Sequence, residues 1–324
     1  MTEVAPFDMT VAFQFPGQGS QAVGMARGFY ETSVAAKAVF EEANDTLGFD
    51  LARLIFDGPE SELTLTANTQ PAVLTASVAA AAACAEQGLR PSIAAGHSLG
   101  EYSALVVAGA LTFADAVRVV RRRGEFMQEA VPVGVGAMAA LLGLPLETVE
   151  GVCEEAAQGP AGREVVDVAN INSPGQIVVA GHRAAVERAV AVAAGRGGRK
   201  SIVLPVSAPF HCALMRPAAE RLAAELEATR VSDPRIPVVR NVDGGVTRAA
   251  ADVKRALLDQ VASPVRWTTC VERLAAEGAR VFIEVGPGRV LTALLRRIVD
   301  GAVGFAVEDP AGLDKVLADK AIVS

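Results

Sequence analysis

The sequence predicts an α/β protein in which helices cover both faces of a mostly parallel sheet. Three short apolar runs, residues 11–15, 93–96 and 281–285, read as buried strands, and each ends at a glycine-containing turn. Helical spacing alternates with these runs, as the crossovers of a parallel sheet require. The length of 324 residues and the 51% of hydrophobic residues allow about two domains, or one large domain with an insertion.

The first part of the chain should supply two of these strands and three helices. Strand 93–96 runs directly into a helix, which places Ser98 at the junction. Pro71 should lie near the first turn of its helix, where a residue without an N–H is tolerated. In chain order we expect strand 11–15, helix 71–87, strand 93–96, helix 99–110 and helix 113–130.

In the middle of the chain the predicted strands and helices follow a different order. The expected elements are strand 137–142, helix 146–157, strands 165–170 and 176–180, helix 184–194 and strand 201–206. This βαββαβ order is typical of a small ferredoxin-like unit. Because the alternating pattern resumes afterwards, we predict an insertion domain over residues 134–205, within a catalytic core formed by residues 1–133 and 206–324.

The last part of the chain returns to the alternating pattern. We expect helix 217–229, strand 238–240, helices 251–261 and 268–277, strand 281–285, and a further helix after Gly286-Pro287-Gly288. From about residue 310 onward we expect a loosely packed tail.

Charge and cysteine content limit the possible partners and compartment. The net charge of −7 and the pI of about 5.2 argue against nucleic acid or an anionic membrane as the main partner. The four cysteines form no C-x-x-C pair, so we expect reduced thiols rather than disulfides or a zinc site. Glu3 and Asp8 do not fit a secretory signal, and the uncharged run 71–85 is shorter than the roughly 20 residues of a spanning helix. We therefore expect a cytoplasmic protein.

Gly96-His97-Ser98-Leu99-Gly100 fits the nucleophile-elbow pattern G-x-S-x-G. Glycines without a Cβ let the chain turn tightly between strand and helix, which exposes the serine hydroxyl. The amide of Leu99 would then lie at a helix N-terminus, where it can donate to a developing oxyanion. The pattern alone occurs by chance, but the strand before it and the helix after it favour a catalytic serine.

A serine nucleophile needs a base, and the chain contains three histidines. His97 adjoins Ser98, and neighbours around a sharp turn usually diverge. His182 opens a predicted helix, which suggests a capping or surface role. His211 lies in a loop that follows a strand, where catalytic groups of α/β proteins gather, although a structural histidine is the alternative. Elimination favours His211.

Three consecutive arginines, Arg121, Arg122 and Arg123, lie on the predicted helix 113–130. Neighbours on a helix are about 100° apart, so at most one or two can face inward, and a solvated face explains the others. An inward guanidinium would be costly unless it met a carboxylate, which it can bind in bidentate geometry.

The loop Gly17-Gln18-Gly19-Ser20-Gln21 follows the first strand. It matches neither nucleotide-binding glycine pattern, so we reject a nucleotide loop. Its glycines would instead let the amide of Gln18 approach a ligand closely.

Seven motifs occur in the order in which they occur in the malonyl-CoA:acyl carrier protein transacylases, and the chain resembles this family from about residue 10 to residue 310. They are Pro16-Gly17-Gln18-Gly19-Ser20-Gln21, Gly96-His97-Ser98-Leu99-Gly100-Glu101, Arg123-Gly124 with Phe126-Met127-Gln128, Asn172-Ser173-Pro174-Gly175-Gln176, the loop ending at His211, Pro264-Val265-Arg266-Trp267, and Glu284-Val285-Gly286-Pro287-Gly288. The resemblance implies an α/β-hydrolase-like core with a ferredoxin-like insertion.

The resemblance also implies residue roles. It implies that Ser98 is the nucleophile and His211 the general base, and that the amides of Gln18 and Leu99 form the oxyanion hole. It also implies that Arg123 binds the malonyl carboxylate. The backbone carbonyl of Gln260 would orient His211. No third, acidic member of the dyad is then expected. His97 matches a residue that lines the acyl pocket. Phe210 matches a variable position at which some members carry serine.

The implied reaction transfers malonyl from malonyl-CoA to the phosphopantetheine thiol of an acyl carrier protein by a ping-pong mechanism, with no metal or redox cofactor. Fatty acid and polyketide synthesis use the same chemistry, so the pathway stays open, and a monomer is the default expectation. One alternative is a serine esterase or acyl hydrolase, although such enzymes order their triad Ser…Asp/Glu…His and need no buried arginine. Another is a non-catalytic module that docks carrier proteins, which retention of both Ser98 and His211 disfavours.

Overall fold

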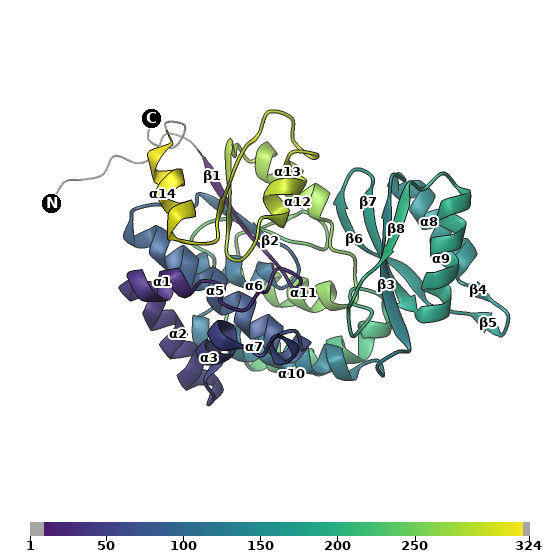
Figure 1. Ribbon diagram of the computed structural model, residues 1–324, viewed down its shortest axis with the longest axis horizontal. Helices are drawn as coiled ribbons and strands as arrows, with labels where there is room; N and C mark the ends of the chain where they lie inside the picture. Colours follow the sequence, from purple (N-terminus) through teal and green to yellow (C-terminus); the bar gives the residue numbers. More distant parts are fainter. Residues whose placement is uncertain (1–9, 320–324) are drawn as a thin grey trace.

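The computed structural model describes residues 10–319, which form a larger α/β part and a smaller part beside it (Figure 1). The N-terminal residues Glu3 and Asp8, on which the absence of a secretory signal was argued, lie outside the described residues. None of the helices described is long and apolar enough to cross a membrane. All four cysteines are free thiols, as expected from their spacing.

The larger part is built on a six-stranded sheet of order β10-β9-β2-β1-β11-β12. Every neighbouring pair is parallel except β10 with β9, so the prediction of a mostly parallel sheet is confirmed. The strands are β1 (Val11–Phe15), β2 (Ile93–Gly96), β9 (Val238–Val239), β10 (Val246–Thr247), β11 (Val281–Val285) and β12 (Val303–Val307).

Helices cover both faces of this sheet because successive strand residues alternate between two apolar clusters. Phe13 and Phe15 pack in the cluster that includes α5 (Thr66–Glu86) and α7 (Phe113–Glu129). Ala12 packs in the cluster that includes α12 (Trp267–Ala276) and α13 (Val290–Leu295). The helices of the larger part are α1 (Arg27–Thr32), α2 (Val34–Leu47), α3 (Leu51–Asp57), α4 (Glu60–Leu63), α5 (Thr66–Glu86), α6 (Gly100–Val107), α7 (Phe113–Glu129), α10 (Arg216–Ala228), α11 (Ala250–Val261), α12 (Trp267–Ala276), α13 (Val290–Leu295) and α14 (Pro310–Ala318), with a short 3₁₀ turn over Ala213–Met215.

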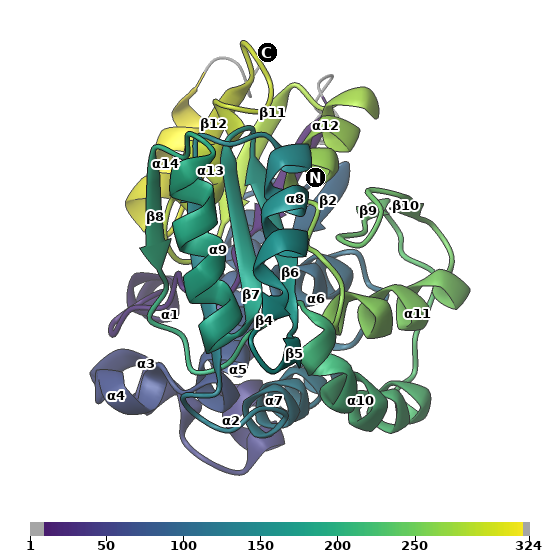
Figure 2. The ribbon, with the colours of Figure 1, turned by 90° about the vertical axis from the view of Figure 1, so that its right-hand side faces the viewer.

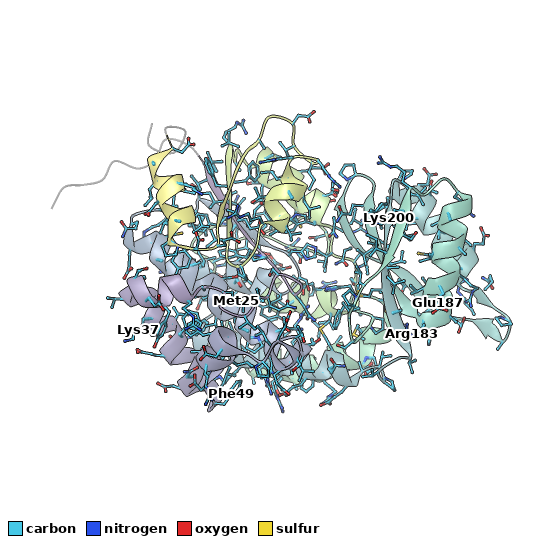
Figure 3. All side chains as sticks on the ribbon, in the orientation of Figure 1. Met25, Lys37, Phe49, Arg183, Glu187 and Lys200 are labelled. Carbon is cyan, nitrogen blue, oxygen red and sulfur yellow. The ribbon has the colours of Figure 1, made fainter. Side chains whose placement is uncertain are left out.

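The smaller part is a four-stranded antiparallel sheet of order β6-β7-β3-β8, with α8 and α9 side by side on its outer face (Figure 2). Its elements are β3 (Gly136–Leu142), α8 (Leu146–Ala156), β6 (Val166–Ser173), β7 (Gln176–His182), α9 (Arg183–Gly195) and β8 (Lys200–Val203), with a hairpin of β4 (Gln158–Gly159) and β5 (Gly162–Arg163) after α8. Figure 3 labels Lys200 on β8 and Arg183 and Glu187 on α9. The predicted βαββαβ order of the main elements is confirmed.

Alternate residues of β3 explain how the two parts meet. Ala139 and Leu141 pack against α8 and α9, while Met138 and Ala140 pack into the main core. Backbone hydrogen bonds join the parts as well, because Ile171 N donates to Val265 O at 2.9 Å. The inner face of the small sheet therefore lies against the larger part.

Two expectations about elements are wrong. Helix α5 begins at Thr66, so Pro71 lies inside it and not in its first turn. The carbonyl of Ala67, which loses its i+4 donor at Pro71, instead accepts from Arg121 Nη1 at 3.0 Å, so a side chain from α7 compensates for the missing N–H.

The second error concerns the end of the chain. Residues 310–318 form α14, with Leu313 and Val316 buried against the core, where we expected a loose tail. Asp309 caps this helix by accepting from Gly312 N at 2.7 Å, and Pro310 occupies its first position. These two start signals were present in the sequence.

Candidate active site

Ser98 lies in the turn between β2 and α6 with a left-handed backbone, at φ 52°. A Cβ at Gly96 would overlap the backbone of Gly100, and a Cβ at Gly100 would overlap the carbonyl of Phe15. Both glycines are therefore required for the close approach of strand, turn and helix. A non-glycine residue at positive φ costs on the order of 1–3 kcal/mol unless its surroundings hold it there.

Two buried amides hold the Ser98 peptide in this conformation. Ser98 N donates to Asn241 Oδ1 at 2.7 Å, and Ser98 O accepts from Gln260 Nε2 at 3.0 Å. Asn241 Nδ2 also donates to Gly96 O at 2.7 Å, at the end of β2. The peptide on each side of the serine is thus tied to residues distant in sequence, which offsets the backbone strain.

The carboxylate of Glu101 binds both Asn241 and Gln260 and so holds them in place. Its Oε2 accepts from Asn241 N at 3.0 Å and from Gln260 Nε2 at 2.8 Å. The side chain is buried, and this burial raises the pKa of Glu101 to about 7 against the opposing effects of these two hydrogen bonds and of the Arg123 charge.

Ser98 and His211 form a hydrogen-bonded pair, with 2.7 Å between Oγ and Nε2. His211 Nδ1 lies 2.9 Å from the carbonyl oxygen of Gln260, which can only accept, so Nδ1 carries the proton and Nε2 is the free base. Burial, followed by the nearby charge of Arg123, lowers the pKa of His211 to about 3. The imidazole is therefore neutral at ordinary pH and able to accept the proton of Ser98.

Arg123 projects from α7 into the same site and is only 2% exposed. Its Nη1 donates to Gln70 Oε1 at 2.9 Å, and its Nη2 donates to Gln260 Oε1 at 2.9 Å and to Ser98 Oγ at 3.2 Å. Nε has no partner, and no carboxylate forms an ion pair with this guanidinium within residues 10–319. Burial lowers the pKa of Arg123, as expected for a cation without a paired anion.

The side chains of the other two arginines of α7 lie outside this site. Arg121 binds Glu125 and Asn68, and Arg122, whose side chain is 52% exposed, binds Glu125 and Glu225. The expectation that only one or two of the three would face inward is confirmed.

A cavity of about 660 Å³ opens over Ser98, between the larger part and the small sheet. Gln18, His97, Arg123, Phe210 and His211 line it together with Ser98. Leu99 and Gln260 are buried beneath it. Much of the remaining wall is apolar, from Met127, Met138, Leu204 and Val206. Such a cavity can take a small acyl group with one charged end.

The amides of Gln18 and Leu99 are free to bind a ligand, because neither donates a hydrogen bond to any residue between 10 and 319. The loop that carries Gln18 packs tightly on the elbow, since a Cβ at Gly17 would overlap the carbonyl of His97. The side chain of Gln18 donates to Thr66 Oγ1 at 3.1 Å, which fixes the loop against α5.

His97 faces the small sheet. Its Nε2 lies 2.9 Å from Asn172 Oδ1, and its ring is tilted against Trp267 at 5.6 Å between centroids. Burial lowers the pKa of His97, so this ring is also neutral. His182, the remaining histidine, accepts from Val165 N through Nδ1 and lies in the small sheet.

Four polar residues of the site were not assigned by sequence reasoning. Glu101 and Asn172 belong to two of the seven motifs, but their spacing does not indicate that either side chain takes part in the site. Gln70 and Asn241 belong to no motif, and only the packing of α5 and of the segment after β9 brings them to Arg123 and Ser98.

Comparison with known proteins gives consistent matches. The family model described as "Acyl transferase domain" matches residues 12–315. The chain is 50% identical over 307 residues to the malonyl CoA-acyl carrier protein transacylase of Salmonella typhimurium, covering 94% of this chain and 98% of the relative.

Two solved structures are similar over nearly their whole length. An acyl carrier protein S-malonyltransferase from Vibrio cholerae superimposes with a TM-score of 0.91 at 49% identity, covering 95% of this chain and 99% of that one. A malonyl-transacylase in complex with its type II polyketide acyl-carrier protein gives a TM-score of 0.91 at 47% identity, covering 94% and 98%.

Proposed function

This chain belongs to the malonyl CoA-acyl carrier protein transacylases, a family of acyltransferases, and from that membership we propose that it transfers a malonyl group from malonyl-CoA to the phosphopantetheine thiol of an acyl carrier protein. The observation that carries this proposal is the buried, carboxylate-free guanidinium of Arg123 beside the hydrogen-bonded Ser98–His211 pair. A malonyl group supplies both things that this site can use, namely an acyl carbon for the serine and a carboxylate for the arginine.

In the first half-reaction His211 Nε2 accepts the proton of Ser98 Oγ as this oxygen attacks the thioester carbonyl. The amides of Gln18 and Leu99 donate to the oxyanion that forms. When the tetrahedral intermediate collapses, the carbon–sulfur bond breaks and the coenzyme A sulfur takes the proton from the His211 imidazolium. The product is a malonyl ester on Ser98.

In the second half-reaction the thiol of the carrier's phosphopantetheine gives its proton to His211 and attacks the ester carbonyl. The bond from the carbonyl carbon to Ser98 Oγ breaks, and the serine recovers the proton from His211. The hydrogen bond from His211 Nδ1 to the carbonyl of Gln260 supports this role, because it keeps Nε2 directed at the serine in both halves.

Two further residues complete the proposed pocket. Phe210, in its wall, would fill the space beside the methylene of the malonyl group, and His97 would border the acyl chain with its neutral ring.

Family membership also supports an α/β-hydrolase-like core over residues 1–133 and 206–324 with a ferredoxin-like insertion over 134–205, and the strand order β6-β7-β3-β8 agrees with such an insertion.

Intact-protein mass spectrometry tests the proposal. After incubation with malonyl-CoA the protein should gain one malonyl adduct on the peptide that contains Ser98, and added phosphopantetheinylated carrier protein should remove it. Ser98→Ala should gain none, and an adduct that persists in this variant would overturn the assignment. Release of free malonate in preference to transfer to the carrier would favour the acyl hydrolase instead.

A further inference from the structure

A buried carboxylate and a buried guanidinium lie at opposite ends of the side-chain amide of Gln260. Gln260 Nε2 donates to Glu101 Oε2 at 2.8 Å, and Gln260 Oε1 accepts from Arg123 Nη2 at 2.9 Å. The three side chains come from α6, α7 and α11, and each residue is at most 2% exposed. One amide therefore connects the two buried charges, which form no direct ion pair in the described part of the chain.

The orientation of this amide is fixed by its two acceptors. Gln260 Nε2 donates to Ser98 O at 3.0 Å as well as to Glu101, so both of its protons are used. Reversing the amide would bring its oxygen against these two acceptors and its NH₂ group against the guanidinium of Arg123. Glu101 therefore acts on Arg123 through Gln260, because it holds Oε1 of the amide toward the guanidinium.

The other titratable groups around Glu101 do not balance its charge. Arg240, in the segment after β9, is already paired with Asp243 at 2.8 Å. Burial raises the pKa of Tyr102 on α6 to about 12, and it also raises the pKa of the Cys270 thiol on α12, so both are neutral at ordinary pH. Within residues 10–319, the buried guanidinium of α7 is therefore the unpaired charge that this carboxylate can balance.

A malonyl ester would change the charge balance of the site. In the free enzyme the buried charges are the anion of Glu101 and the cation of Arg123, since His97 and His211 are neutral. A malonyl group on Ser98 would add a second carboxylate, directly against the guanidinium. Two buried anions would then share one cation, and the low dielectric of a buried site disfavours the uncompensated charge.

Glu101 is the carboxylate better suited to lose its charge. It lies one amide further from Arg123 than a malonyl carboxylate would, and burial already raises the pKa of Glu101 to about 7. Its Oε2 accepts from Asn241 N and Gln260 Nε2, whereas Oε1 has no hydrogen-bond partner between residues 10 and 319. A proton on Oε1 would thus leave both existing hydrogen bonds in place.

We propose that Glu101 is a positioning residue that balances Arg123 through Gln260 in the free enzyme and takes up one proton when the malonyl carboxylate pairs with Arg123. This inference rests on the proposed function, because an acyl group without a second carboxylate would bring no extra charge. The proton passes from hydronium or a buffer acid in solution to Glu101 Oε1, and no other bond changes. Malonylation of Ser98 therefore consumes a proton.

The pH dependence of the acylation equilibrium tests this coupling. Since Glu101 titrates near pH 7 in the free enzyme and at higher pH in the malonyl enzyme, the malonyl enzyme binds more protons between these two values. Formation of the malonyl enzyme should therefore become less favourable as the pH rises above 7, by up to about tenfold per pH unit.

Intact-protein mass spectrometry at a fixed ratio of malonyl-CoA to coenzyme A measures this equilibrium between pH 6 and pH 8.5. Glu101→Gln keeps an oxygen that can accept from Asn241 N and Gln260 Nε2 but cannot take up a proton. The coenzyme A thiol ionises equally in both experiments, so the ratio of the wild-type equilibrium constant to that of Glu101→Gln should fall with pH for malonyl-CoA. The same ratio should stay constant for acetyl-CoA. Glu227→Gln, at an exposed carboxyl, should follow the wild type.

A second measurement uses the wild type alone, so it does not depend on how well Glu101→Gln folds. A pH indicator in weakly buffered solution at pH 7.5 should record proton uptake when stoichiometric enzyme is mixed with malonyl-CoA, and less uptake with acetyl-CoA at equal acylation. Equal uptake from both donors, together with a pH-independent ratio for malonyl-CoA, would overturn the coupling even though Ser98 becomes malonylated. Absence of any malonyl adduct would instead overturn the proposed function.

Discussion

Nη2 of Arg123 lies 3.2 Å from Oγ of Ser98, on the serine that also contacts His211 Nε2 at 2.7 Å. The nucleophile is therefore flanked by a base and by a buried cation. In a malonyl ester one methylene separates the carboxylate from the acyl carbon, so an acyl group on Ser98 would have its carboxylate within reach of this guanidinium. The same short spacing would leave the cation without a partner when the acyl group is acetyl.

Arg123→Ala should lower kcat/KM for malonyl-CoA by about one to two powers of ten, because a charged hydrogen bond contributes roughly 1.5–3 kcal/mol. The effect on acetyl-CoA should be smaller, so the ratio of the two kcat/KM values should fall. Arg122→Ala is the matched control, since Arg122 lies on the same helix and faces solvent. An unchanged ratio in Arg123→Ala would show that this residue is not the carboxylate partner.

His211→Ala should slow formation of the malonyl-serine ester by roughly 10²–10⁴-fold, the usual contribution of a general base. Quenched-flow mass spectrometry measures this step directly. His97→Ala is the comparison, because His97 bonds to Asn172 and not to the serine. A larger loss in His97→Ala than in His211→Ala would exchange the two roles.

The acylation rate should stay nearly constant as the pH falls from 8 to 5. The neutral imidazole is the active form, and with the pKa of His211 lowered to about 3 it stays neutral far below the ordinary value of 6.5. Since Arg123 is the second cause of this shift, the acidic limb should move to higher pH in Arg123→Ala. A rate that already halves near pH 6.5 in the wild type would contradict the lowered pKa.

Phe210→Ser should admit methylmalonyl-CoA, because the ring lies in the wall of the cavity over Ser98 and its removal leaves room for a methyl branch. The ratio of kcat/KM for methylmalonyl-CoA to that for malonyl-CoA should rise by about tenfold, the lower end of what a methyl-sized steric contact contributes. Phe126→Leu, at a buried ring of α7 that the guanidinium groups of Arg122 and Arg221 cover, controls for a general loss of packing. A ratio that stays at the wild-type value would leave Phe210 as a packing residue.

Glu101→Gln should change how stability depends on pH. Burial raises the pKa of Glu101 to about 7, above its unfolded value of 4.5, so the folded state binds more protons between these values and stability falls as the pH rises through that window. The loss is on the order of 3 kcal/mol across the window. Urea unfolding at pH 5 and pH 8 should show this decrease in the wild type and less of it in Glu101→Gln. Glu227→Gln, at an exposed carboxyl, should behave like the wild type, and parallel slopes in all three proteins would contradict the prediction.

Much of the architecture follows from local sequence. Strand 93–96 and strand 281–285 begin and end where the apolar runs predicted, because short runs bounded by glycine turns leave few alternatives. The position of Ser98 at a strand–helix junction follows from the same pattern. Where the sequence misled, at Pro71, a contact distant in the chain was responsible, since Arg121 supplies the donor that the proline lacks.

The family resemblance placed residue roles that spacing by itself left open, and the tertiary structure added what neither could supply. Helical spacing says that few of the three arginines face inward, but packing of α7 on α5 decides that Arg123 meets Gln70. Likewise Asn241 follows a two-residue strand, with no motif to mark it, and only the folded sheet brings its amide to Ser98 N. Local sequence determines backbone conformation through steric and hydrogen-bonding preferences of a few neighbours. The partners of a buried polar group, by contrast, depend on which distant segments pack together, and that is decided only when the whole core forms.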